Sequence, residues 1–169
     1  MLGISAHIDT FSRDNLPEKS MQPDFLLDNY NYPDFINVAE ELTDVMVKKG
    51  FGDHIALIGN GRRRTYKELT DWTNRLANTL VDDYGVKPGN RILIRSANNP
   101  AMVACWLAAT KVGAVVVNSM PMLRSLELDK IIKKAKITHA LCDSRLLNEI
   151  EKSFKSNSYL KYLIPFDGT

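Results

Sequence analysis

The second half of the chain alternates short apolar runs with helical patterns at a regular spacing, and this feature limits the possible folds most. The runs begin at residues 91, 114, 138 and 159, so their starts are 21 to 24 residues apart. That distance accommodates a strand, a helix and two short connections, which together form the βαβ unit of a parallel sheet. The predicted strands are Arg91–Arg95, Ala114–Val117, Thr138–Cys142 and Tyr159–Ile164.

Because these runs are almost entirely apolar, we expect strands that are covered on both faces. The predicted helices between and after them are Pro100–Val112, Leu126–Lys136 and Arg145–Phe154. Asn98 or Asn99 before Pro100 is a start signal for the first helix, and Ser125 is the expected cap of the second. The sequence therefore predicts an α/β fold, a parallel sheet with helices on both faces and right-handed crossovers.

The first half predicts an N-terminal arm, one helix and a β-hairpin ahead of a further long helix. Residues 1–35 contain three prolines and read as an irregular arm, so we divide the chain into this arm and an α/β domain over residues 36–169. A helix is expected from Asn37, with Glu40 completing a capping box, to a stop at Gly50. Gly59–Gly61 predicts the hairpin turn between His54–Ile58 and Arg62–Tyr66. Thr65 and Glu68 form a second capping box, which opens a helix ending near Tyr84 and Gly85.

Composition excludes several functional classes. The 169 residues are 44% hydrophobic and 25% charged, with a net charge of +2, which is typical of a soluble globular domain. This near-neutral charge favours neither a nucleic acid nor an anionic membrane as a partner. The start lacks the pattern of a secretory signal, and no apolar run is long enough to span a bilayer, so we expect a cytoplasmic protein. Cys105 and Cys142 are interpreted as buried free thiols.

Polar residues follow three of the predicted strands, at the edge where parallel sheets usually bind ligands. The segments are Ser96–Asn99, Asn118–Pro121 and Asp143–Ser144. All three contain residue types that cap helices, and we favour capping over ligand contact for each.

The sequence motifs of nucleotide binding and of common hydrolases are missing. Gly59-Asn60-Gly61 lacks the third glycine of a dinucleotide fingerprint, and no Gly-rich loop ends in Gly-Lys-Ser or Gly-Lys-Thr. The run Arg62–Arg64 is interpreted as a solvated strand of the hairpin rather than a phosphate site. His139 falls in a predicted core strand, where a hydrogen-bonded structural histidine is expected. We assign no catalytic residue and no metal ligand.

Ordered motifs occur within Thr65–Asp143: TYKEL at 65–69, NRLA at 74–77, GVKPGNR at 85–91, NNP at 98–100 and KVGAV at 111–115. In this order and spacing they resemble the opening of the adenylate-forming superfamily, which contains acyl-CoA synthetases, luciferases and the adenylation domains of peptide synthetases. Further stretches resemble the 2-aminobenzoate–CoA and benzoate–CoA ligases: SAHIDTF at 5–11, NPAMVACW at 99–106, MPMLR at 120–124 and HALCD at 139–143.

This resemblance implies the activity of an AMP-forming acid–CoA ligase. Such enzymes use Mg-ATP to convert a small-molecule carboxylate to an acyl-adenylate, release pyrophosphate and transfer the acyl group to CoA. It also implies that this chain is an N-terminal fragment of a longer enzyme. The parent enzyme would use ATP, Mg and CoA, whereas the fragment is expected to bind no cofactor and to be inactive alone. In relatives the phosphate loop, the acid pocket and the catalytic lysine lie downstream.

The resemblance implies three candidates for the CoA side of the parent enzyme. In some relatives a basic residue in the segment that matches Pro121–Ser125 lies near the CoA phosphates, and Arg124 is the nearest basic residue here. Asn118 and Ser119 are expected to border the thioester tunnel. Two other readings of the chain remain open. One is a stand-alone module that binds CoA or a nucleotide at the sheet rim. The other is an interaction domain that forms a homo-oligomer through surface exposed by truncation.

Overall fold

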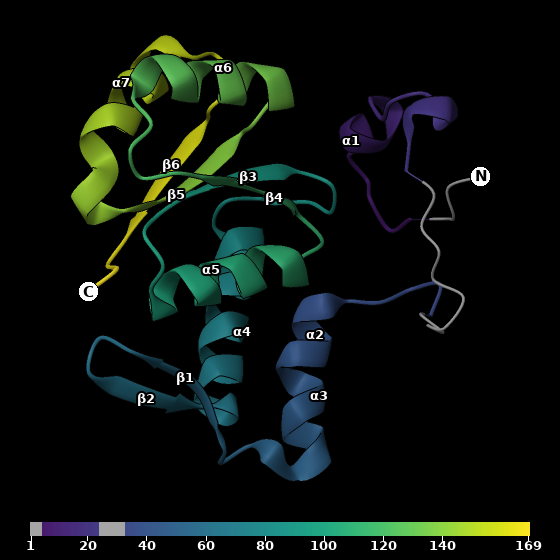
Figure 1. Ribbon diagram of the computed structural model, residues 1–169, viewed down its shortest axis with the longest axis vertical. Helices are drawn as coiled ribbons and strands as arrows, with labels where there is room; N and C mark the ends of the chain where they lie inside the picture. Colours follow the sequence, from purple (N-terminus) through teal and green to yellow (C-terminus); the bar gives the residue numbers. More distant parts are fainter. Residues whose placement is uncertain (1–4, 24–32) are drawn as a thin grey trace.

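The computed structural model describes residues 5–23 and 33–169 of the chain. Its central feature is a parallel sheet of four strands in the order β4-β3-β5-β6 (Figure 1). The strands are β3 (Arg91–Arg95), β4 (Val115–Ser119), β5 (His139–Asp143) and β6 (Tyr162–Phe166). The predicted fold class is therefore confirmed.

Two pairs of helices cover the two faces of this sheet (Figure 1). On one face lie α4 (Tyr66–Asp82) and α5 (Pro100–Lys111), and on the other α6 (Ser125–Ala135) and α7 (Leu147–Ser156). All five residues of β3 and all five of β5 are buried, whereas most residues of β4 and β6 are not. This difference follows from strand position, since the central strands have neighbours on both sides as well as both faces.

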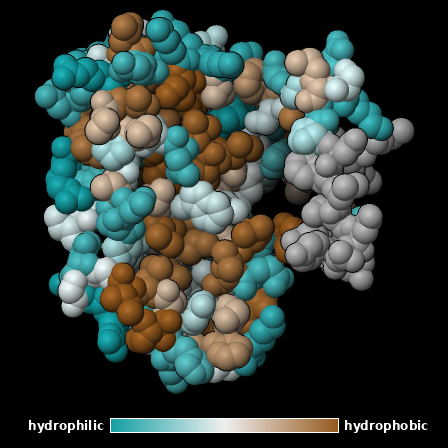
Figure 2. Space-filling model, viewed as in Figure 1, coloured by the Kyte–Doolittle hydropathy of each residue, from teal (hydrophilic) through white to brown (hydrophobic). Residues whose placement is uncertain are grey.

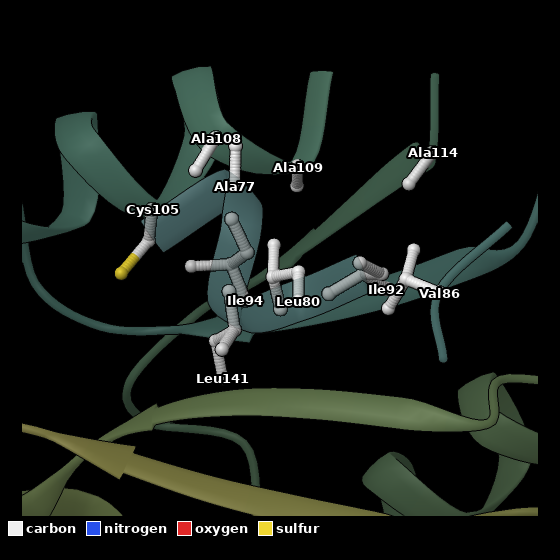
Figure 3. Close-up of a cluster of buried hydrophobic side chains, with 10 residues drawn as sticks. All are labelled: Ala77, Leu80, Val86, Ile92, Ile94, Cys105, Ala108, Ala109, Ala114 and Leu141. Carbon is white, nitrogen blue, oxygen red and sulfur yellow. The ribbon is translucent and has the colours of Figure 1, made fainter. Parts of the chain in front are cut away.

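The core beneath α4 and α5 depends on small side chains. Ala108 and Ala109 of α5 lie against Ile92 and Ile94 of β3, and all four are at most 1% exposed (Figure 3). Alanines allow the helix axis to approach the sheet closely, and each buried isoleucine contributes roughly 1.5–3 kcal/mol through removal of its side chain from water. A second cluster on the opposite face includes Leu128 of α6 and Ile150 of α7.

Two helix starts agree with the sequence signals. The side chain of Asn99 accepts a hydrogen bond from Met102 N at 2.8 Å, and Pro100 occupies the first helical position of α5. At α4, Thr65 Oγ1 accepts from Glu68 N while Glu68 Oε2 accepts from Thr65 N, which completes the capping box.

The cap predicted for α6 was wrong by one residue. The helix begins at Ser125, so Arg124 occupies the N-cap position. Glu127 Oε2 accepts from Arg124 N at 2.8 Å, but no reciprocal bond is possible because a guanidinium has no acceptor. The Ser125 N–H donates to Glu149 of α7 instead.

Three strands extend beyond the predicted ends. The parallel register pairs Arg95 with Ser119 and Asp143 with Phe166, so β4 continues to Ser119, β5 to Asp143 and β6 to Phe166. β6 also begins at Tyr162, three residues after the predicted start. A polar residue or a proline is acceptable in β4 and β6, because an edge strand has one side without ladder partners.

The hairpin forms as predicted, with β1 (Ile55–Gly59) antiparallel to β2 (Arg62–Thr65). The helix before it is broken, in contrast to the continuous helix expected from Asn37 to Gly50. It comprises α2 (Val38–Leu42), α3 (Asp44–Met46) and a π-helical turn over Val47–Phe51. At the break, Thr43 leaves helical geometry with φ −126° and ψ −81°, and its hydroxyl donates to Ala39 O at 2.5 Å.

The cap and stop signals predicted for this broken helix were correct in part. Asn37 accepts from the amides of Ala39 and Glu40, so it caps α2. Among the hydrogen bonds of the described residues, none from Asn37 N to Glu40 completes the box; Glu40 instead lies 3.8 Å from Lys48. Gly50 has φ 90°, the left-handed geometry expected at a helix end.

Residues 5–23 contain two short helices, α1 (Phe11–Asp14) and η1 (Lys19–Met21). Asp9 connects this part of the chain to β3 through a 2.6 Å ion pair with Arg91, whose guanidinium also lies 4.7 Å from the ring centre of Phe11. Residues 24–32 of the expected arm lie outside the described residues, and the division at residue 35 stays a prediction. No described helix is long and apolar enough to cross a membrane.

Candidate functional site

The strand order places a switch point between β3 and β5. From β3 the chain crosses to β4 on one side, and from β4 it crosses back to β5 on the other side of β3. Ligands of open α/β sheets usually bind at such a point, beyond the carboxyl ends of the strands. Ser96 follows β3 and Asp143 ends β5, so both lie at this rim.

Asp143 is the centre of a buried polar cluster at the switch point. Its carboxylate accepts from the Arg145 side chain at 2.9 and 2.6 Å, from Arg145 N at 3.0 Å and from Ser96 Oγ at 3.4 Å. Hydrogen bonds from the Arg145 side chain hold the pKa of Asp143 below its usual range, although burial opposes this shift. Asp143 is therefore an ionised structural group that is saturated with donors.

The chain itself fills the space above this cluster. Arg145 Nη2 and Asn60 Nδ2 each donate to Gly168 O at 3.3 Å, and Ser144 Oγ donates to Phe166 O at 3.0 Å. A Cβ on Gly168 would lie 2.0 Å from Asp143 Oδ2, so only glycine fits there. The switch point is thus occupied by residues that follow β6.

Arg95 organises the neighbouring part of the rim. This residue is 2% exposed, and its guanidinium donates to the carbonyls of Met120, Pro121 and Leu123 at 2.8–3.0 Å and to Leu146 O at 3.3 Å. A buried cation is costly unless it is hydrogen-bonded, and here carbonyl oxygens accept four hydrogen bonds from the guanidinium. Arg95 therefore determines the path of the loop from β4 to α6.

That loop leads from the candidate CoA-side residues Asn118 and Ser119, at the end of β4, to the third candidate, Arg124. Asn118 is exposed near the end of β4, whereas the buried Ser119 donates its hydroxyl to Ile94 O at 3.4 Å. Arg124 lies at the far end of the loop with an exposed side chain. Asn118 and Arg124 are thus solvent-accessible on the same rim, and the hydroxyl of Ser119 is already engaged by the sheet.

The preference for helix capping was correct for two of the three rim segments. Asn99 caps α5, and Asp143 accepts from Arg145 N at the start of η3 (Ser144–Leu146). Asn118–Pro121 caps no helix. Instead, Arg95 fixes this segment through its carbonyls, and the only signal in the sequence was an arginine at the end of an apolar run.

His139 and the two cysteines are structural, as expected. His139 is 4% exposed, its Nε2 lies 3.0 Å from Tyr84 O, and burial lowers its pKa. Cys105 and Cys142 are free and buried, and burial raises the pKa of each thiol to about 12, so neither is a nucleophile at neutral pH. The part of the chain that the structure describes has no cluster of three or more side chains suited to a metal ion.

Comparison with known proteins gives the family. The family described as AMP-binding enzyme matches residues 46–168, which covers the hairpin, α4, all four parallel strands and the polar rim. The chain belongs to this family. The superfamily resemblance expected from the ordered motifs is therefore confirmed.

Relatives of this AMP-binding chain include ligases of aromatic acids. A 3-hydroxybenzoate–CoA ligase of Aromatoleum sp. (strain CIB) is 37% identical over 82 residues, which is 48% of this chain and 16% of that enzyme. A salicylyl-CoA synthase/salicylate adenylyltransferase of Streptomyces sp. is 32% identical over 96 residues, 57% of this chain and 17% of that protein. The matched region thus spans about one sixth of these relatives.

Solved structures agree with the fold of this AMP-binding chain. The anthranilate CoA ligase AuaEII, in complex with anthranoyl-AMP, superposes with a TM-score of 0.73 at 18% identity over 80% of this chain and 26% of that one. A benzoate CoA ligase from Burkholderia xenovorans LB400 superposes with a TM-score of 0.71 at 21% identity. The match covers 79% of this chain and 26% of that one. At these identities the likeness shows a shared architecture.

Proposed function

We propose that this chain forms part of an AMP-forming ligase that joins an aromatic carboxylic acid to CoA, with ATP cleaved to AMP and pyrophosphate. The observation that carries the proposal is the family match over residues 46–168, together with relatives named for hydroxybenzoate and salicylate. A stand-alone binding module is less well supported, because the matched family consists of enzymes. A cytoplasmic location stays a prediction.

Within such an enzyme, the loop from β4 to α6 would contribute to the CoA side. Asn118, near the end of β4, and Arg124, at the end of this loop, are exposed and present an amide and a cation, groups suited to the polar and phosphorylated parts of CoA. Arg95 holds this loop in place through its hydrogen bonds to the carbonyls of Met120, Pro121 and Leu123. Ser119 would act as structural support, since its hydroxyl is bonded to Ile94 O.

ATP and Mg would be held elsewhere. Clustered backbone amides or fixed cations usually bind a triphosphate, and this sequence contains no Gly-rich phosphate loop. Asp143, the most buried carboxylate of the rim, has its oxygens occupied by Arg145 and Ser96. The residues of this chain therefore provide a scaffold and a polar rim rather than the reacting groups.

A chimeric enzyme tests the proposal. Residues 46–168 would replace the matching segment of an active 3-hydroxybenzoate–CoA ligase, and thioester formation would be followed by mass spectrometry. We expect activity to be retained, because the segment supplies the same sheet and rim. A chimera that folds and binds ATP but forms neither adenylate nor thioester would contradict the proposal.

The isolated chain gives a second prediction. Incubated with ATP, labelled pyrophosphate and benzoate, 2-aminobenzoate or 3-hydroxybenzoate, it should show no ATP–pyrophosphate exchange above background. The intact ligase used for the chimera serves as positive control. Clear exchange by the chain alone would mean that its own residues bind and activate ATP.

A further inference from the structure

A polar cavity of about 350 Å³ lies beside the rim, outside the candidate CoA side. Its walls come from the hairpin turn, β2, α4, the first turn of α5 and the residues after β6. Arg62 and Arg64 both line it, together with Asn60, Trp72, Ala101 and Asp167. Figure 1 shows the hairpin turn and the C-terminal end of the chain on the same side of the molecule.

The two arginines share one face of β2. Side chains alternate along a strand, so Arg62 and Arg64 lie on the cavity side and Arg63 lies on the other, opposite the exposed Ile58. The guanidinium of Arg64 is 4.5 Å from the ring centre of Trp72, and this stacking restrains it. Among the described residues, no acidic group lies within 4.0 Å of either guanidinium.

Specific contacts hold the walls of the cavity in place. The hairpin turn lies so close to α5 that a Cβ on Gly59 would be 2.7 Å from Pro100 Cγ. Asn60, at φ 53°, donates its side-chain amide to Gly168 O and so attaches the turn to the residues after β6. The hairpin turn, the first turn of α5 and the residues after β6 are therefore held together by the fold, and the exposed Arg62 and half-buried Arg64 extend from this frame.

The start of α5 adds a backbone donor. Pro100 has no N–H, and the Met102 amide is capped by Asn99. In the described part of the chain, the amide of Ala101 has no acceptor among protein atoms, and Ala101 is a lining residue of the cavity. First-turn amides carry partial positive charge and commonly bind oxyanions.

We propose that this cavity binds a phosphate group, either as free phosphate or as part of a larger ligand. Two arginines that face one cavity without acidic partners, next to an unused helix amide, match the donors that a phosphate requires. Asp167 opposes binding, because its carboxylate lines the same cavity and hydrogen bonds from Thr169 keep its pKa low. Arg62 and Arg63 are exposed, as expected for a solvated strand, and Arg64 is half-buried against Trp72.

Titration of the full chain with inorganic phosphate tests the site. Binding would be measured by calorimetry at low ionic strength and by the change in tryptophan fluorescence, to which Trp72 at the cavity and Trp106 both contribute. Arg62→Gln and Arg64→Gln should each weaken binding about tenfold or more, as expected for loss of a charge-assisted hydrogen bond. Arg63→Gln removes the same charge from the other face of β2 and should change affinity less than about twofold. Asp167→Asn should strengthen binding.

AMP and CoA, titrated in parallel, distinguish the source of the phosphate. Tighter binding of either than of inorganic phosphate, with the same sensitivity to Arg64→Gln, would assign the site to a larger ligand. Thermal unfolding of every variant excludes a folding defect. No saturable binding at millimolar phosphate, or equal weakening by Arg63→Gln, would overturn the proposal. None of these outcomes depends on the ligase activity proposed above.

Discussion

The carboxylate of Asp143 lies at the carboxyl end of β5, where its side chain is 1% exposed and paired with Arg145 at 2.6 Å. It joins three segments that are far apart in the sequence, because Ser96 donates to it and Gly168 packs against it. Arg145 is half exposed, so solvent weakens the ion pair itself. Most of the stabilisation therefore comes from hydrogen bonds to a buried anion.

Asp143 gives a prediction about pH. Its pKa is lower in the folded state than in the unfolded chain, where it is about 3.9, so its contribution is complete above that value. The contribution is lost as pH falls through the folded-state pKa. Asp143→Asn should lower the free energy of unfolding by about 2 kcal/mol at pH 6. The difference from the native chain should shrink towards pH 2 in urea-unfolding experiments.

Asp82→Asn is the matched control, since it removes the same charge from an exposed position at the end of α4. It should change stability by less than about 0.5 kcal/mol at either pH. A constant effect of Asp143→Asn across the pH range would mean that the native carboxylate does not titrate as described.

At the scale of elements, helix starts differ in how they are fixed. The capping box of α4 is made by Thr65 and Glu68 within four consecutive residues, so it is visible in the sequence. The start of α6 instead depends on α7, because Glu149 accepts the Ser125 N–H across 24 residues. A local pattern cannot reveal a cap that another helix supplies.

Two alanine substitutions measure this difference. Thr65→Ala removes a side-chain acceptor and should lower the free energy of unfolding by about 1 kcal/mol. Ser125→Ala keeps the backbone N–H that bonds to Glu149, so its effect should be clearly smaller. Chemical unfolding of both variants checks the prediction. An equal or larger effect of Ser125→Ala would show that its hydroxyl caps α6 after all.

At the scale of the molecule, the sheet has open edges and the surface has apolar side chains. Within the described residues, β4 and β6 each pair on one side only. Met120, Met122 and Leu126 are 63%, 82% and 68% exposed near the carboxyl end of β4. Figure 2 shows hydrophobic residues reaching the surface across the middle of the molecule. Exposed apolar surface of this kind favours association.

We therefore expect the chain to self-associate in a concentration-dependent way, which light scattering after size-exclusion chromatography would detect. Met122→Lys combined with Leu126→Lys should reduce association, because two charges would be buried in the contact. Ile58→Lys is the control, since Ile58 is 73% exposed on the hairpin, away from this loop. A monomer at every concentration would contradict the expectation.

The sequence by itself determined the family of this protein and most of its helices and strands, although not their exact ends or the break at Thr43. Apolar runs, capping residues and the hairpin glycines affect structure through residues that are close in the sequence. The four parallel strands, α5 and the cap at Thr65 could therefore be predicted. Only the tertiary structure decided which polar groups meet. Arg95 bonds to carbonyls more than 20 residues away, and Arg145 and Asn60 converge on Gly168. The fold likewise places Arg62 and Arg64 in the lining of one cavity, whereas Arg63 does not line it. Hydrogen-bond partners and cavities depend on distances in space, and a linear pattern does not contain the strand order that sets those distances.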